Sequence, residues 1–360
     1  MLYKKKIIII FLLILITPVV LLGLVRFFFS TLETEKVLKS IYFKNNKKII
    51  YFGDSVLNAD HNTKYNKSSL VNIFDNTIKM ESIEISGAAY NPYIYHKYFE
   101  TIINYNSKIK LIIIPINLRA FSSSWMRVPE FQFEQECSFL SIINLKPDYL
   151  CIKEHTKNIL FKNRIFLKRK EFLDEKVNLK GFLNSTKRKF FHDLDDCRIV
   201  NFENEKKYSC KSKEALDQMN EYLQYKKNLK HIIYTLRYKY HYGEIINDDN
   251  VSLKNLKAIV ALANKSNKKV LFYITPHNIE DILYSSVNRS GDEITKIMEQ
   301  NLIKINEVLN GNNIYKLNLI GLLKSKHFNP KCACEHIDQQ GKKSISKNIS
   351  NFIITKIGSI

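Results

Sequence analysis

The stretch Lys48-Ile-Ile-Tyr-Phe-Gly-Asp-Ser55 is the key to the fold of this chain. An apolar run is followed at once by Gly53 and Asp54, a pattern that is typical of a buried strand ending in a loop. Similar runs recur along the chain at Ser82-Ile-Glu-Ile85, Ile109-Lys-Leu-Ile-Ile-Ile114, Lys269-Val-Leu-Phe-Tyr-Ile274 and Asn313-Ile-Tyr-Lys-Leu-Asn-Leu319. With the first stretch, these runs predict a sheet of five strands.

Helical patterns lie between the predicted strands. They run at about 93–105, 252–266, 293–309 and 340–355. Strands that alternate with helices form a parallel sheet covered on both faces, so we expect a three-layer α/β domain. In such sheets ligands bind beyond the carboxyl ends of the strands. We therefore expect the functional side chains in the loops at that edge.

Residues 121–250 interrupt the alternation. They are rich in Lys, Asp, Asn and aromatic residues and contain four of the six cysteines. We interpret them as a largely helical insertion, a cap or subdomain beside the site, with one helix at Ser212 to Leu229. The α/β domain itself would then consist of 47–120 and 251–360.

An uncharged apolar segment, Ile7 to Val25, precedes the α/β part. At about 1.5 Å rise per residue its length fits a hydrocarbon core of about 30 Å. Lysines stand at positions 4 to 6, so the positive-inside rule leaves 1–6 in the cytoplasm and sends the following chain across. We expect a single-pass anchor in the cell (inner) membrane, a polar connector over 26–46, and a periplasmic or extracellular domain. A cleaved signal peptide is the alternative, although its apolar region is usually shorter.

The formal net charge is +21. The lysines are scattered through isoleucine- and asparagine-rich sequence and form no single basic arm, so we expect no nucleic-acid partner. A solvated basic surface is the simplest interpretation. The functional one is attraction to anionic lipid headgroups or to an acidic envelope polymer.

Six cysteines in an exported chain are compatible with disulfides. The pairs close enough in sequence to form local loops are Cys137 with Cys151 and Cys197 with Cys210. Sequence alone does not choose among the pairings. Cys332, Cys334 and His336 alternate, and in an extended segment they would share one face as metal ligands do. Because no second ligand group is evident, we predict no metal site.

A candidate nucleophile follows the first strand. Gly53-Asp54-Ser55 places a serine hydroxyl at the turn into the next helix, where an ordinary helix N-cap is the simpler role. A serine needs a base, and His336 lies in Glu335-His-Ile-Asp-Gln-Gln-Gly341, after the fifth strand and before the last helix. The N–H of Gly87 and the side-chain amide of Asn117, with the N–H of Ser55, can supply three oxyanion donors.

These residues resemble the four blocks of the SGNH/GDSL hydrolase superfamily. The blocks are Gly53-Asp54-Ser55, Gly87, Asn117 and His336-Ile-Asp-Gln-Gln-Gly341, each after a strand. The resemblance covers the sheet scaffold and leaves out the insertion. It implies a flavodoxin-like sheet and no cofactor. Ser55 would be the nucleophile and an oxyanion donor, Gly87 and Asn117 would complete the oxyanion hole, and His336 would be the base.

Two departures from the family pattern concern the site. The third block is usually Gly-x-Asn-Asp, and here it is Pro115-Ile-Asn-Leu118. An Asp normally stands three residues before the histidine, where this chain has Ala333. We take Glu335 as the first candidate for the third triad member and Asp338 as the second. A Ser-His dyad oriented by a backbone carbonyl is the alternative.

Within the superfamily, the chain looks most like envelope members that work beside membrane-bound O-acyltransferases. The anchor, Ile85-Ser-Gly-Ala-Ala89 and the third block, 111–121, are similar to those of proteins of teichoic-acid D-alanylation and alginate acetylation. This implies a serine esterase or O-acyltransferase that transfers or removes acyl groups on a cell-envelope polysaccharide, with a membrane-bound O-acyltransferase as partner. The alternative is a catalytically inactive SGNH-like scaffold that binds the polymer or the acyltransferase.

Three further residues are weaker candidates for substrate binding. Arg119 and Trp125 closely follow the third block, where ion pairing and stacking would suit an anionic or sugar substrate. Core packing or simple exposure is the plainer interpretation for both. His277 follows the fourth strand at the same edge, and its plainer role is that of a loop histidine that supports the site.

Overall fold

The computed structural model describes 17, 20, 23–24, 26–43, 47–58, 69–105, 108–126, 132–160, 197–202, 205–210, 238, 241–284, 290–328 and 335–358. Five parallel strands form its central sheet, in the order β2-β1-β3-β6-β7. The strands are β1 (Ile49–Gly53), β2 (Ser82–Ser86), β3 (Leu111–Ile116), β6 (Lys269–Ile274) and β7 (Ile314–Asn318). This is the order of a doubly wound sheet, with the switch point between β1 and β3. The predicted five-stranded parallel sheet is confirmed.

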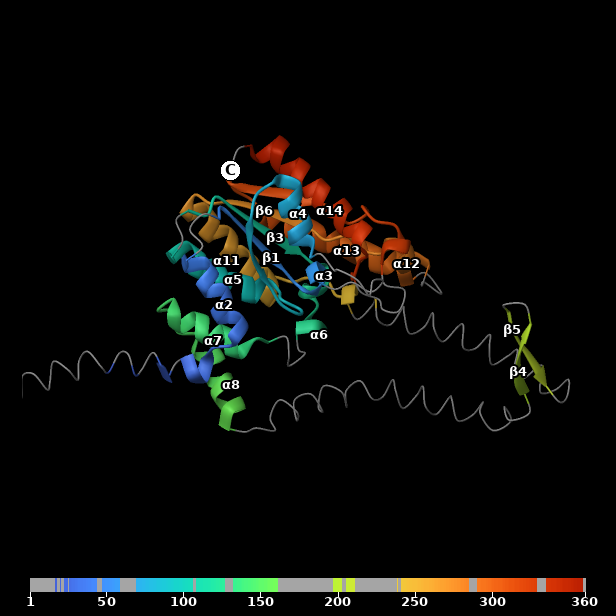
Figure 1. The fold of residues 1–360 in the computed structure, drawn as a ribbon, viewed down its shortest axis with the longest axis horizontal. Helices are drawn as coiled ribbons and strands as arrows, with labels where there is room; N and C mark the ends of the chain where they lie inside the picture. Colours follow the sequence, from blue (N-terminus) through green and yellow to red (C-terminus); the bar gives the residue numbers. More distant parts are fainter. Residues whose placement is uncertain are drawn as a thin grey trace, which may run out of the picture.

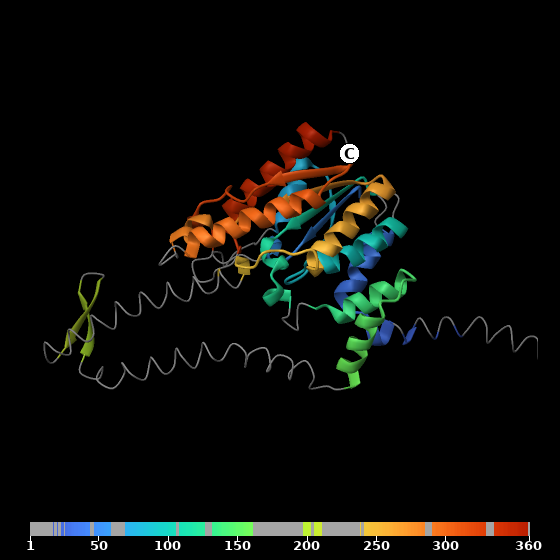
Figure 2. The same cartoon turned by 180° about the vertical axis from the view of Figure 1, so that it is seen from behind.

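Helices cover both faces of the sheet (Figures 1 and 2). One face packs against α5 (Pro92–Tyr105), α11 (Val251–Ser266) and α13 (Ser290–Val308), and the other against α4 (Leu70–Ile78) and α14 (Gln339–Phe352). The strand β1 shows why: Ile50 and Phe52 belong to the first hydrophobic cluster, whereas Ile49 and Tyr51 belong to the second. Strand side chains alternate between faces, so a strand that is apolar throughout must be covered on both.

The third strand was predicted to end at Ile114, but it continues through Pro115 to Ile116. Pro115 lies inside β3, opposite Tyr273 of β6. The pairing of β3 with β1 covers only Leu111 to Ile113, so Pro115 lies beyond the last paired residue on that side. A proline, which lacks an N–H, is tolerated in a strand where no ladder hydrogen bond is required of it.

The remaining elements lie at the sheet edge or outside it. They are α2 (Leu32–Phe43), α3 (Ser55–Asn58), η1 (Leu118–Phe121), α6 (Ser123–Met126), α7 (Glu134–Ile143), α8 (Tyr149–Leu160), β4 (Cys197–Phe202), β5 (Glu205–Cys210), α12 (Ile279–Tyr284), η5 (Ser325–His327) and a π-helical turn (Ile353–Ile357). The β4–β5 hairpin was not expected in an insertion predicted to be largely helical. The helix predicted at 212–229 lies outside the described residues.

The predicted membrane anchor, Ile7 to Val25, also falls mostly outside the described residues. Of its positions, only 17, 20, 23 and 24 are described, all of them helical. No helix within the described part of the chain has both the length and the apolar character needed to cross a membrane. The anchor therefore stays a prediction that the structure does not support.

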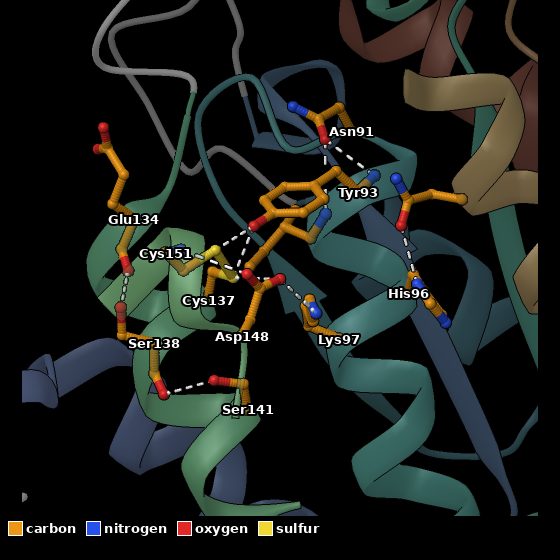
Figure 3. The surroundings of a disulfide bond; sticks show 12 residues. Asn91, Tyr93, His96, Lys97, Glu134, Cys137, Ser138, Ser141, Asp148 and Cys151 are labelled. Carbon is orange, nitrogen blue, oxygen red and sulfur yellow. Dashed lines mark hydrogen bonds and ion pairs between the residues drawn. A yellow bond between two sulfur atoms is a disulfide. The ribbon is translucent and has the colours of Figure 1, made fainter. Parts of the chain in front are cut away.

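A disulfide joins α7 to α8. It links Cys137 to Cys151, one of the two local pairings considered from the sequence. Figure 3 shows the hydroxyl of Tyr93, on α5, directed at both sulfurs, and Lys97 one turn further along α5 pairs with Asp148 at 3.0 Å. The helix α5 thus holds the bridged pair from the side. The β4–β5 register places Cys197 opposite Cys210, and a disulfide there stays a prediction.

Candidate functional site

Ser55 and His336 meet at the carboxyl edge of the sheet. Ser55 is the first residue of α3, directly after β1, and His336 precedes α14. The distance from Ser55 Oγ to His336 Nε2 is 3.1 Å, across 281 positions of sequence. This is within the range for direct proton transfer between a nucleophile and a base. The predicted contact is confirmed, and the catalytic roles stay predictions.

The turn that carries Ser55 is capped by its neighbour. Asp54 is buried, its Oδ1 accepts a hydrogen bond from the N–H of Val56 at 2.8 Å, and its main-chain carbonyl accepts from Leu57. The N-cap role that the sequence allowed for Ser55 therefore belongs to Asp54. Because Asp54 caps the helix, the Ser55 hydroxyl is directed at His336 instead.

The segment that carries His336 is fixed by the two residues that follow it. Ile337 forms a β-bridge with Phe328, and the N–H of Asp338 donates to the carbonyl of His327 at 2.9 Å. The Asp338 carboxylate caps α14 by accepting from Gly341 N–H at 2.7 Å and also contacts His327 Nδ1 at 3.1 Å. These contacts bind the short loop before α14 to the chain at the end of η5.

The first two candidate oxyanion donors, Ser55 and Gly87, lie just after β1 and β2. Gly87 is half-buried, and its N–H donates to the carbonyl of Gly53 at 3.4 Å, so it takes part in the strand ladder. A Cβ at this position would collide with the ring of Tyr90, so a larger residue would force that ring to move. Ser55 contributes the first N–H of α3.

The third candidate donor, Asn117, faces two carboxylates. Its Nδ2 donates to Asp54 Oδ2 at 3.0 Å and lies 3.5 Å from Glu335 Oε2. Its Oδ1 accepts from the N–H of Arg119 and thereby caps η1. Both amide hydrogens thus point at acidic groups in this state, and stabilising an oxyanion would require at least one of them to change partner.

Neither candidate for the third triad member points to that role. The bonds of the Glu335 carboxylate are to Arg119 Nη1 at 3.1 Å and to Asn117. The bonds of the Asp338 carboxylate are to His327 and Gly341. Glu335 thus forms a buried ion pair and Asp338 caps a helix, and a triad role for either carboxylate stays a prediction.

The ion pair between Arg119 and Glu335 lies beneath the site. Their side chains are only 6% and 2% exposed. Burial raises the pKa of Glu335, and the Arg119 guanidinium opposes that rise while the nearby Asp54 adds to it. A buried pair of this kind contributes little net stability, but removing one partner leaves an uncompensated charge and costs about 3–5 kcal/mol. The pair joins the loop after β3 to the loop before α14.

The weaker substrate-binding candidates lie mostly inside the protein. Arg119 and His277 are buried, and Trp125 is half-buried with its ring 4.2 Å from the Arg119 guanidinium carbon. Trp125 also lies 5.3 Å from the ring of His241. Burial of Arg119 and His277 agrees with the plainer roles that the sequence favoured for them, and substrate binding stays a prediction.

His277 is a neutral histidine within the core. Its Nδ1 contacts the carbonyl of Thr275 at 2.8 Å, which makes Nδ1 the protonated nitrogen, and Nε2 has no hydrogen-bond partner among the described residues. Burial lowers the pKa of His277 to about 4, and the charge of Arg119 adds to the lowering. Its ring packs 5.1 Å from that of Tyr242. This is the supporting role that the sequence favoured.

Potential metal ligands gather at one place in the described residues, away from Ser55. These are Cys137, Asp148 and Cys151, and both sulfurs are already joined in the disulfide. A metal needs the free thiolate, so this group does not fit one. Of the alternating Cys332, Cys334 and His336, the two cysteines lie outside the described residues.

A buried polar network thus surrounds an accessible Ser-His pair. The ion pair was not predicted from the sequence: a charged residue just after the apolar β3 was a signal, but nothing in the sequence indicated its partner. Neither a scan against protein-family models nor a search of curated proteins finds a match. The geometry of the Ser-His pair is therefore the main guide to function.

Proposed function

We propose that this chain is a membrane-anchored, extracytoplasmic serine acyl-esterase or O-acyltransferase of the SGNH type. The observation that carries the proposal is the contact of 3.1 Å between Ser55 Oγ and His336 Nε2. The strand order of the sheet also supports it, because flavodoxin-like sheets have this order. Ligands in such sheets bind where this pair lies, beyond the carboxyl ends of the strands.

The proposed reaction has two acyl-transfer steps. His336 Nε2 takes the proton of the Ser55 hydroxyl while Oγ attacks the ester carbonyl, and a tetrahedral oxyanion forms. The intermediate collapses, the C–O bond of the ester breaks, and the leaving alcohol takes the proton from His336. Water or a glycan hydroxyl then attacks the acyl-enzyme by the same route, which gives hydrolysis or transfer and restores Ser55.

The location and partners are part of the proposal. The disulfide between Cys137 and Cys151 supports a compartment outside the cytoplasm, since such bonds are rare in cytosolic proteins. The apolar, uncharged sequence from Ile7 to Val25 supports a membrane anchor. We propose a cell-envelope polysaccharide as substrate and a membrane-bound O-acyltransferase as partner, both on the resemblance described above.

Labelling with a fluorophosphonate tests the proposed nucleophile. We expect the full chain to react at Ser55, and Ser55→Ala to abolish labelling. Ser123→Ala is the matched control, because Ser123 is an exposed serine outside the proposed site. Absence of labelling in folded protein, under conditions that label a known serine esterase, would overturn the enzymatic proposal.

An inactive scaffold that binds an envelope polymer or the acyltransferase is the second candidate. It is favoured by the amide of Asn117, whose hydrogens face Asp54 and Glu335, and by Gly87, whose N–H donates to Gly53. Such a protein would bind purified envelope polysaccharide and remain unlabelled. Labelling of Ser55 that depends on His336 would exclude it.

A further inference from the structure

An apolar groove runs between α2 and α7, away from Ser55. Its volume is about 460 Å³. The lining is mostly aliphatic and aromatic, with two basic residues and one acidic residue: Leu38, Tyr42, Phe43, Phe139, Ile142, Ile143, Leu145, Arg26, Lys39 and Glu35. The ends of the two helices are held together by Tyr105, whose ring lies 5.2 Å from Tyr42 and whose hydroxyl donates to the carbonyl of Ile143.

Leu145, which lines this groove, has an unfavourable side-chain exposure and an unfavourable backbone conformation. Its side chain is 86% exposed. Its backbone has a φ of 54°, the left-handed conformation that follows many helices and is normally taken by glycine or asparagine. Phe43, the last residue of α2, also lines the groove and is 78% exposed. Strained backbone together with exposed large apolar groups indicates a functional surface.

The groove also contains Arg26, the residue that directly follows the uncharged segment Ile7 to Val25 in the sequence. Arg26 and Lys39 outnumber the single acid, Glu35, which lies 4.0 Å from Arg26. Next to the groove, α8 contacts the same chain segment, since His155 Nε2 lies 3.0 Å from the carbonyl of Phe28. Further exposed apolar side chains on these two segments are Phe27, Leu32, Tyr149, Leu150 and Leu160.

We propose that the groove between α2 and α7 binds an acyl chain of an anionic membrane lipid. The apolar lining takes the hydrocarbon, Arg26 and Lys39 face the headgroup, and Phe43 and Leu145 contact lipid where they are now exposed. We favour a membrane lipid as the occupant, because the predicted anchor segment ends at Val25, directly before Arg26. The inference rests on the membrane location within the proposed function and is independent of the chemistry at Ser55.

Photo-crosslinking from lipid tests this site in the full chain. The protein is reconstituted in vesicles of phosphatidylcholine and phosphatidylglycerol, with a phosphatidylglycerol that has a diazirine in its acyl chain. We expect crosslinks to concentrate on α2 and α7, and F43D/L145D to reduce them about tenfold, since charges replace apolar contacts. The matched control is I303D/I354D, which changes two residues that are 62% and 67% exposed and lie outside the groove.

The alternatives give different results. Crosslinks spread evenly over the surface, or unchanged in F43D/L145D, would overturn the proposal. So would a dimer joined through α2 and α7 in lipid-free protein, because the groove would then bind a second copy. Fluorophosphonate labelling reports the Ser55 site separately. Release of the chain from membranes by alkaline extraction would contradict the proposed membrane anchor. If the released chain also failed to bind the same vesicles, the proposed lipid site in the groove would be overturned as well.

Lys39→Glu tests the headgroup part of the proposal. Lys39 is exposed, so the substitution should leave the fold intact. We expect it to lower crosslinking from phosphatidylglycerol severalfold, because one favourable charge becomes repulsive, and to affect a phosphatidylcholine analogue much less. Equal loss with both lipids would contradict a role in recognising anionic headgroups.

Discussion

His277 and His336 stand at the same edge of the sheet, in the loops after β6 and β7, but their surroundings differ. His277 is buried, its Nδ1–H is bound to a carbonyl, and burial lowers its pKa to about 4. His336 is half-buried, and its Nε2 faces a serine hydroxyl. A histidine can act as a base only where a proton donor faces it and the resulting positive charge can be held. This difference favours His336 as the proposed base and His277 as a supporting residue.

Removing His336 should have the largest effect. We expect His336→Ala to slow fluorophosphonate labelling of Ser55 by about 10²- to 10⁴-fold, because a positioned base contributes that much to proton transfer. His277→Asn should leave the labelling rate within about twofold at neutral pH, where the native residue is uncharged. Time courses of labelling provide the measurement. Similar losses in both variants would contradict the distinction between the two histidines.

Breaking the ion pair between Arg119 and Glu335 should have the second largest effect, and this effect is on stability. Arg119→Met leaves Glu335 buried without its partner, and we expect a loss of about 3–5 kcal/mol in the free energy of unfolding. Adding Glu335→Gln should recover much of that loss, because the double variant buries no charge. Urea denaturation measures both. A loss below about 1 kcal/mol for the single variant would show that the pair is not buried as described.

His277 should make stability depend on pH. Its pKa is about 4 in the folded protein, against an ordinary value of 6.5. Between these values the unfolded chain binds the proton more tightly than the folded chain. The free energy of unfolding therefore rises with pH, and it decreases by about 3 kcal/mol in total as the pH falls from 6.5 to 4. We expect His277→Asn to remove this part of the dependence. Parallel curves for parent and variant from pH 4 to 7 would contradict the burial of a neutral imidazole.

Asp338 should have the smallest effect. Its carboxylate caps α14, so we expect Asp338→Ala to cost about 1 kcal/mol of stability and to leave labelling of Ser55 unchanged. Asp338→Asn is the matched control, because asparagine also caps helices. Thermal unfolding and labelling rates separate the two roles. A loss of labelling comparable to that of His336→Ala would make Asp338 the third member of a triad.

The strands and the Ser-His contact could be predicted from the sequence for one physical reason. Apolar runs such as that of β1 must be buried, and parallel strands bring their carboxyl ends, with Ser55 and the loop before α14, to one edge. The Arg119–Glu335 pair and the orientation of the Asn117 amide could not be predicted. They depend on side-chain packing between loops that are far apart in sequence, where no periodic pattern applies.

The disulfide bears on the order in which the molecule can assemble. Cys137 and Cys151 are separated by 14 positions, and α7 and α8 need no later part of the chain to be brought together by this bond. During synthesis the covalent link can therefore form before β6 and β7 exist. His336 follows these two strands in the sequence, so Ser55 can meet it only after they have been made. In a nascent chain the disulfide could thus form early, whereas the contact between Ser55 and His336 would form late.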